Sequence, residues 1–219
     1  MSIEHTEALR SKMQASLDLL IGKIGKIQIG TKEQFPLGWR NAAKGRTVWR
    51  IIEEVIIQNL EKYYAELDIN TITVAETETT IYDFSVVFEG EESPVYVNIK
   101  SAVSGGKTQK DDISKGAGLQ KFYETDINRD FYVATFFISF NDDMSISLEK
   151  ATVFPIAWVP DVYINPSNNG NLQSSKYKNL DFAEKRTTAE FYDVLIEAMK
   201  KALEAKHKKL NVKSLDTEQ

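Results

Sequence analysis

Residues 131–140 constrain the fold most, because their side chains are aromatic or β-branched on both faces of an extended segment. Successive side chains of a strand point to opposite sides, so a strand that is apolar on both sides needs cover on both sides. Aromatic and β-branched residues also favour strands. The sequence therefore predicts a central strand in a sheet that is flanked by helices.

The remainder of the chain alternates predicted helices with predicted strands and shows no internal repeat. Apolar residues at helical spacing predict helices at 3–24 and from about Thr47 to Glu66, and a shorter one at 117–124. Thr187 and Glu190 match a capping box that opens a C-terminal helix. Strands are expected at 70–76, 81–88, 95–102, 130–140 and 146–158. A Gly/Lys loop is expected from residue 103 to the short helix, polar loops at 31–46 and 165–175, and a frayed tail from about Lys208.

The short helix lies between the third and fourth predicted strands, which is the arrangement of a strand-helix-strand crossover. A chain of 219 residues fits one domain with a substantial core. We therefore expect a single α/β domain with a central mixed β-sheet.

The residue types exclude several kinds of site. The chain has no cysteine, and its two histidines, His5 and His207, lie near the termini. A metal site must then use oxygen ligands, which suits Mg²⁺ or Mn²⁺. The sequence predicts no membrane span and no secretory signal. The net charge of −5 does not indicate nucleic-acid binding, although a local cationic cleft matters more than the total.

Polar side chains interrupt the predicted hairpin at positions that alternation places on one face. Asn98 and Lys100 alternate with Val97 and Ile99, and Asp83 lies one strand upstream. In the preceding strand, Tyr82 and Phe84 are expected on the apolar face. Asp83, Asn98 and Lys100 are then free to converge on the other side.

Glu53 adds a fourth polar group to this set. It falls roughly 100° from the centre of the apolar stripe of its helix, at 100° per residue. Its carboxylate is therefore expected to reach the edge of a packed cleft, whereas Glu54 is expected to face solvent.

The order of a helix with Glu53, a strand with Asp83, a turn and then Asn98-Ile99-Lys100 resembles the PD-(D/E)xK nuclease superfamily. Within it, the chain is most similar to small type II restriction endonucleases of the EcoRV/HincII/SwaI group. The resemblance spans roughly residues 45–175. The chain departs from the family motif at two positions, with Tyr82 in place of proline and Asn98 in place of an acid.

The resemblance implies a restriction-endonuclease-like fold with an N-terminal helix and loop (1–46), a catalytic core (47–160), a DNA-recognition loop region (161–186) and a C-terminal helix and tail (187–219). It implies a homodimer that clasps double-stranded DNA, reads a short palindrome and cuts both strands with Mg²⁺, with Mn²⁺ as a substitute. The products would carry 5′-phosphates, and the enzyme would act in a prokaryotic cytoplasm.

The same resemblance assigns roles to the polar group. Asp83 would be the main metal ligand, the Asn98 oxygen a weaker one, and the main-chain carbonyl of Ile99 would complete the set. Lys100 would assist the attacking water, and Glu53 would support a second metal ion or a water. Asn and Gln side chains pair with adenine, and Lys and Arg contact phosphates. The expected DNA contacts are Gln34, Arg40, Asn41, Lys44, Arg46, Lys107, Gln109, Lys110, Asn169, Asn171 and Gln173.

Two other interpretations remain open. Asn98 brings no negative charge, so the chain is either a lineage that tolerates the amide or a DNA-binding relative that no longer cuts. The polar residues also fit the solvated face of an ordinary hairpin and ordinary surface loops. In that case the protein is an α/β interaction module without a nucleic-acid function.

Overall fold

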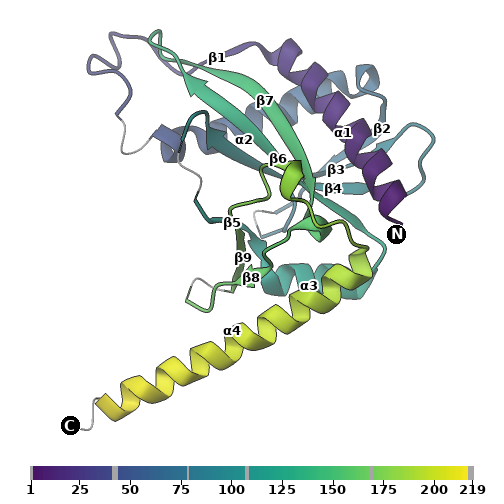
Figure 1. The fold of residues 1–219 in the computed structure, drawn as a ribbon. Coiled ribbons are helices and arrows are strands. Elements are labelled where there is room, and N and C mark those ends of the chain that lie inside the picture. The colour runs from purple at the N-terminus through teal and green to yellow at the C-terminus, as the bar shows by residue number, and fades with distance from the viewer. Residues whose placement is uncertain (1, 41–43, 78, 107–108, 168–169, 217–219) are drawn as a thin grey trace.

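The computed structural model describes residues 2–40, 44–77, 79–106, 109–167 and 170–216, without the side chains of 44–47 and 209–216. In this part of the chain the main sheet is curled and has six strands in the order β1-β7-β6-β4-β3-β2 (Figure 1). Strands β4 and β6 are parallel, and the other neighbours are antiparallel. The strands are β1 (Lys26–Gln28), β2 (Ile69–Val74), β3 (Phe84–Phe88), β4 (Val95–Val103), β6 (Asp130–Phe140) and β7 (Ser145–Pro155).

A smaller antiparallel sheet lies beside the main one, in the order β5-β9-β8. It combines β5 (Asp111–Lys115), which follows β4 in the chain, with β8 (Tyr163–Ile164) and β9 (Asn171–Ser174). The ladder between β5 and β9 shifts register between Asp112 and Ser114, so Ile113 occupies a bulge.

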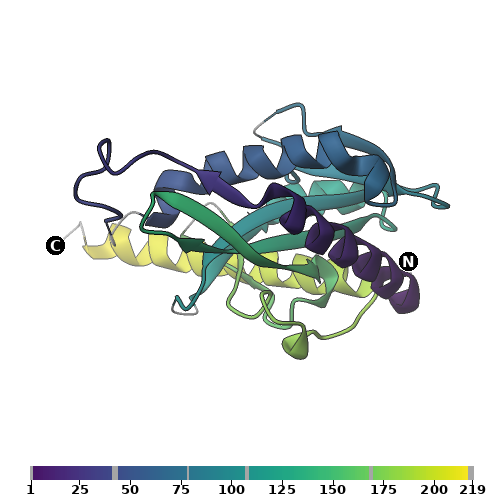
Figure 2. The same cartoon turned by 90° about the horizontal axis from the view of Figure 1, so that it is seen from above.

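Helices cover the main sheet on both faces (Figures 1 and 2). Helices α1 (Ile3–Ile24) and α2 (Lys44–Tyr63) pack on one face. Helices α3 (Gly116–Thr125) and α4 (Thr188–Asp216) pack on the other, and the C-terminal part of α4 extends away from the rest of the chain in Figure 1. The described residues also form short 3₁₀ helices, which are η1 (Tyr64–Glu66), η2 (Ile156–Trp158) and η3 (Leu180–Phe182).

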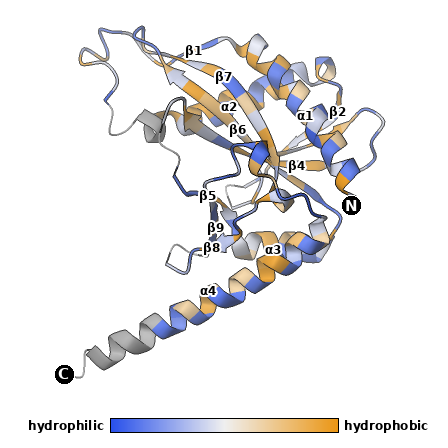
Figure 3. Ribbon diagram, in the orientation of Figure 1, coloured by the Kyte–Doolittle hydropathy of each residue, from blue (hydrophilic) through white to orange (hydrophobic). Residues whose placement is uncertain are grey.

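Strand β6 divides the core into two halves, as its sequence predicts. Tyr132, Ala134 and Phe136 are fully buried among the side chains of α1 and α2. Phe131 and Val133 are buried in the second cluster, together with side chains of α3 and α4. In Figure 3 the helices carry both hydrophobic and hydrophilic residues, which is typical of helices that use only one of their faces to pack on a sheet. The single α/β domain with a mixed sheet flanked by helices is thereby confirmed.

Helix α2 packs through residues four positions apart. Val48, Ile52, Ile56 and Leu60 are fully buried, and each such side chain contributes about 1.5–3 kcal/mol relative to exposure. Ile51 is also apolar but is exposed, because the buried stripe follows one four-residue row. This packing fixes Glu53, the residue after Ile52, at the edge of the buried row.

The capping box of the C-terminal helix is confirmed. The main-chain N–H of Thr187 donates to the Glu190 carboxylate at 2.7 Å, and the N–H of Glu190 donates to Thr187 Oγ1 at 3.3 Å. The helix runs to Asp216, so the prediction of a tail frayed from Lys208 is wrong for the backbone.

Several predicted boundaries differ from the structure. The strand expected at 81–88 begins at Phe84, so alternation does not extend to Tyr82, whose ring packs on Tyr96 on the opposite side of the sheet from Phe84. The strand expected to reach residue 158 ends at Pro155 and continues as η2. The loops expected before 117 and at 165–175 each contain a strand, β5 and β9, because pairing with one another stabilises two segments too polar to be recognised alone. In the described part of the chain, no helix is long and apolar enough to cross a membrane.

Candidate functional site: an acidic and basic pocket between the two sheets

Glu53, Asp83, Asn98 and Lys100 line one pocket of about 230 Å³. They come from α2, the residue before β3, and β4, so the structure brings together the four side chains that the sequence singles out. The wall opposite comes from the small sheet. The pocket is also lined by Trp49, Arg50, Thr80, Ile81, Asp112, Ile113, Ser114, Lys115 and Asn171.

Main-chain pairing of the hairpin sets the position of Asp83. Its N–H donates to the carbonyl of Val97 at 2.9 Å, and its carbonyl accepts from the N–H of Ala75 at 2.9 Å. Its carboxylate accepts a hydrogen bond from the N–H of Ile99 at 2.5 Å. This bond ties the acid to β4 between Asn98 and Lys100, which share one face of that strand. The Ile99 side chain is buried in the core, and its main-chain oxygen remains a predicted ligand.

The Asn98 side chain is a tie between the two sheets. It is buried, and its Nδ2 donates to the carbonyl oxygen of Ile113 at 2.8 Å. Ile113 is the bulged residue of β5, so the bulge turns this carbonyl away from the ladder. A carboxylate at position 98 would place an acceptor against that acceptor. Within the amide, Oδ1 is the atom that remains for a ligand.

Burial makes Glu53 and Asp83 reluctant to ionise, and the charge of Asp83 adds to the effect at Glu53. Burial raises the pKa of Glu53 to about 7, the negative charge of Asp83 adds to the rise, and Arg50 and Lys100 partly offset it. Burial also raises the pKa of Asp83, against the Ile99 N–H and the charges of Lys100 and Arg50. Acids with raised pKa values in a cleft are common at functional sites. A cation placed between them would relieve the repulsion.

Arg50 and Trp49 complete the α2 side of the site, and sequence analysis missed both as site residues. The Arg50 guanidinium lies 4.1 Å from the centre of the Trp49 ring and 3.6 Å from the Glu53 carboxylate. Arg50 is one turn before Glu53, so this ion pair follows from helical spacing. The i, i+3 pattern of arginine and glutamate was the available signal.

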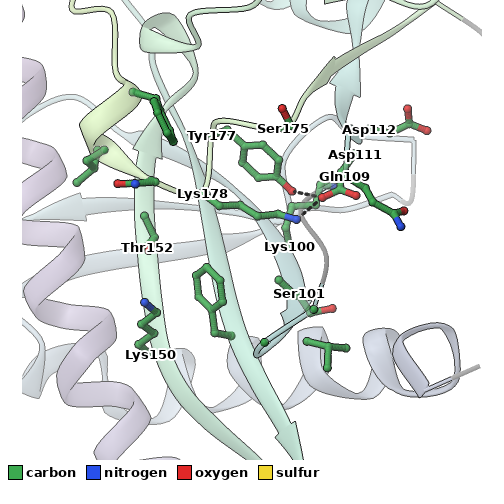
Figure 4. A pocket seen from close by; sticks show the side chains of 18 of the residues that line it. Lys100, Ser101, Gln109, Asp111, Asp112, Lys150, Thr152, Ser175, Tyr177 and Lys178 are labelled. Atoms are coloured by element: carbon green, nitrogen blue, oxygen red, sulfur yellow. Dashed lines mark hydrogen bonds and ion pairs between the residues drawn. The ribbon is translucent and has the colours of Figure 1, made fainter. Parts of the chain in front are cut away.

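A larger cavity of about 1300 Å³ adjoins the pocket and shares Trp49, Lys100 and Asp112 with it (Figure 4). Its wall runs from the end of β4 across β6 and β7 to the segment after β9. Among the described residues, four basic and two acidic side chains line it, although the whole chain carries a charge of −5. These are Arg10, Lys100, Lys150, Lys178, Asp111 and Asp112.

The Asp111 carboxylate accepts hydrogen bonds from Lys178 and Tyr177 in this cavity (Figure 4). The side chain of Lys150 lies against the ring of Phe137, 4.8 Å from its centre. Lys150 lies in β7 and Lys178 follows β9, and the sequence analysis connected neither segment of the chain with lysines at the site. No local pattern distinguishes them from surface lysines, because only the pairing of β7 with β6 and the position of the segment after β9 bring them to the cavity.

The predicted DNA contacts are placed unevenly. Gln109 lines the larger cavity, and the Lys110 ammonium lies over the ring of Tyr163, 4.6 Å from its centre. Gln34 and Arg40 are exposed and lie outside both of these cavities, and Gln34 Oε1 accepts from the N–H of Thr31. Asn41, Lys107 and Asn169 lie outside the described residues, as do the side chains of Lys44 and Arg46.

Asn171 and Gln173 are side chains of β9 and not of a loop. Both donate hydrogen bonds to Asp112, at 3.1 and 2.6 Å, and Asn171 lines the pocket with Lys100. Asp112 itself was missed, because residues 103–116 were interpreted as a loop. Ile113 is the single apolar side chain between Ser104 and Lys115, and it was the only sequence signal of a strand there.

Within the described residues, no three histidine, aspartate or glutamate side chains come together as a protein-only metal centre does. The acids available to a metal ion are Glu53 and Asp83, supplemented by neutral oxygens, because Asp112, the third acid that lines the pocket, accepts hydrogen bonds from Asn171 and Gln173. No protein-family model matches the chain, and no curated protein matches it. The function is therefore inferred from the geometry and from the resemblance of the motif.

Proposed function

We propose that the protein is a Mg²⁺-dependent nuclease that cuts double-stranded DNA at a specific sequence, as type II restriction endonucleases do. The observation that carries this proposal is the convergence of Glu53, Asp83, Asn98 and Lys100 on one pocket. The order of α2, the meander β2-β3-β4, helix α3 and the parallel strand β6 also supports a restriction-endonuclease-like fold.

The donor set fits Mg²⁺, which binds through one or two carboxylates and leaves its other positions to water and substrate phosphates. Asp83, the Oδ1 of Asn98, the carbonyl of Ile99 and Glu53 would hold the ion. When bound, it supplies positive charge to the phosphate oxygens and acidifies water. The raised pKa values of Glu53 and Asp83 support this assignment. They show that negative charge is unfavourable in the pocket, and a bound cation would stabilise it.

Lys100 faces the same pocket and is the group best placed to act on the phosphodiester. Its ammonium stabilises negative charge that develops on the phosphate and orients the attacking water. Attack on the phosphorus with departure of the 3′ oxygen leaves a 5′-phosphate. The adjoining cavity, among whose described lining residues the basic side chains outnumber the acidic ones four to two, supports a polyanionic substrate of the size of a DNA strand.

A homodimer belongs to the same proposal, because cutting both strands of a palindrome requires one pocket for each strand. So does action in a prokaryotic cytoplasm, where such enzymes meet foreign DNA.

One observation favours the second candidate, a DNA-binding relative that does not cut. The Asn98 amide is engaged by Ile113 and contributes no charge, so the pocket has one acid fewer than the family motif. This candidate predicts the same salt-sensitive binding without hydrolysis.

Digestion of a sequenced plasmid with Mg²⁺ or Mn²⁺, followed by mapping of the ends, tests the proposal. We expect cuts at one short sequence and 5′-phosphate ends. Lys100→Ala should lower the cutting rate at least a hundredfold while duplex binding changes little. Normal cutting by Lys100→Ala would remove Lys100 from the chemistry, and binding without cutting by the native chain would favour the second candidate.

A further inference from the structure

Two amides of β9 converge on the carboxylate of Asp112 in β5. Asn171 Nδ2 donates to one carboxylate oxygen at 3.1 Å, and Gln173 Nε2 donates to the other at 2.6 Å. Asp112 and Gln173 are directly opposite each other in the β5–β9 ladder. Both oxygens of Asp112 therefore hold a side chain of the neighbouring strand.

This arrangement fixes which way each amide faces. A carboxylate accepts hydrogen bonds and does not donate them, so each amide must turn its nitrogen toward Asp112. The oxygen of Gln173 accepts a second bond from Asn165 Nδ2 at 3.2 Å. The oxygen of Asn171 is buried and has no hydrogen-bond partner among the described residues.

The two amides consequently offer different groups to a ligand. An amide nitrogen has two hydrogens, and Asn171 gives one of them to Asp112. It keeps one N–H next to an unpaired Oδ1, and such a pair matches the N7 acceptor and the N6 amino donor of adenine. Gln173 keeps an N–H but its oxygen is engaged, so it matches a lone acceptor such as a purine N7 or thymine O4.

We propose that Asp112 is a positioning residue for sequence recognition, which holds Asn171 in the orientation that selects adenine in duplex DNA. The proposal rests on the proposed nuclease function. Asn171 lines the same pocket as Asp83 and Lys100, so base recognition and strand cleavage would take place in one pocket. An unpaired buried acceptor destabilises the free chain, and an adenine amino group that reaches it recovers the loss. Because this oxygen is covered in the free chain, the neighbouring side chains must shift as DNA docks.

Asp111 provides a matched control on the same strand. Its carboxylate accepts hydrogen bonds from Lys178 and Tyr177, whereas Asn171 and Gln173 donate to Asp112. Figure 4 shows the Asp112 carboxylate pointing away from this pair. Asp111→Asn and Asp112→Asn therefore make the same change in charge, but only the second forces an amide of β9 to turn its oxygen inward.

The test is selection of a duplex pool of random sequence by the full chain, with Ca²⁺ in place of Mg²⁺ so that the DNA stays uncut. We expect the native chain to retain a short motif that contains adenine. Asp112→Asn and Asn171→Ala should each lower the preference for adenine by about tenfold, and at the same motif position. Asp111→Asn should keep the motif. An unchanged motif in folded Asp112→Asn, or loss of preference at different positions, would overturn the inference.

A second measurement covers the case in which Asp112→Asn does not fold. The native chain is titrated with motif duplexes in which each adenine in turn is replaced by 7-deazaadenine or by purine without its amino group. Both replacements should weaken binding about tenfold at one shared position. If neither replacement changes the affinity at any adenine of the motif, the inference is overturned. If the native chain retains no motif and its DNA binding is insensitive to salt, the proposed function itself fails, which is a distinct outcome.

Discussion

The Nδ2 of Asn98 donates to the main-chain oxygen of Ile113 across 2.8 Å, and this bond joins β4 of the main sheet to the bulge of β5. The residue that departs from the nuclease motif is therefore an integral hydrogen-bond donor of the fold. An acid at this position would lose that bond and leave the carbonyl facing a second acceptor.

Asn98→Asp should lower the free energy of unfolding by about 1–3 kcal/mol at pH 8. The loss should be smaller at pH 5, because a protonated carboxyl donates to Ile113 again. Urea unfolding at the two pH values measures this. Asn59→Asp is the control, since Asn59 makes an equally short bond to Val55 within α2 and is only half-buried. The opposite outcome is an Asn98→Asp variant that is as stable as the native chain and cuts DNA when the native chain does not. The amide would then stand in place of an acidic metal ligand, and the second candidate would hold.

Glu53 should make the chain less stable as pH rises. Its pKa is raised to about 7 in the folded chain, so the folded state holds a proton that the unfolded state releases near pH 4.5. This contribution is full below about pH 4.5 and disappears as pH rises through about 7. Glu53→Gln should therefore gain about 2 kcal/mol of stability over the native chain between pH 4.5 and pH 8, after allowance for partial screening by solvent. Urea unfolding across this range measures it, and Glu54→Gln, on the exposed side of the same helix, should leave the pH profile unchanged.

Divalent ions should stabilise the chain by neutralising Glu53 and Asp83 in the pocket. Mg²⁺ or Mn²⁺ at a hundred times its dissociation constant adds about 2.7 kcal/mol to the free energy of unfolding. The shift in Tm on addition of the ion measures the effect. Asp83→Asn should abolish most of the shift. The comparison uses the shift and not Tm itself, because Asp83 also holds the N–H of Ile99. An equal shift in Asp83→Asn would place the ion elsewhere.

Lys150 and Lys178 should contact phosphates through the larger cavity. Each lysine that neutralises one phosphate contributes about −0.9 to the slope of log K against log salt. Lys150→Ala and Lys178→Ala should each make that slope shallower by about this amount, with weaker binding to every sequence. Fluorescence anisotropy of a labelled duplex at several salt concentrations measures the slope. Lys23→Ala is the control, since Lys23 pairs with Glu66 and lines neither of these two cavities, and an unchanged slope for both cavity lysines would remove this surface from DNA binding.

Local patterns were enough to predict the central strand, the capping box and the shared face of Asn98 and Lys100. These features depend on residues a few positions apart, because alternation and helical spacing act within one element. The same patterns predicted Glu53 at the edge of the packed row. Alternation failed at Tyr82, where the strand had not yet begun.

The sequence alone thus determined a mixed sheet between helices and the polar set Glu53, Asp83, Asn98 and Lys100. Tertiary structure alone decided that β5 and β9 are strands and that Asp112 bonds Asn171 and Gln173, 59 and 61 residues away. It also decided that Asn98 holds Ile113. The physical reason is that a polar segment has no periodic signal of its own. It becomes a strand only when a distant partner supplies the hydrogen bonds, and that partner is not encoded in its neighbours.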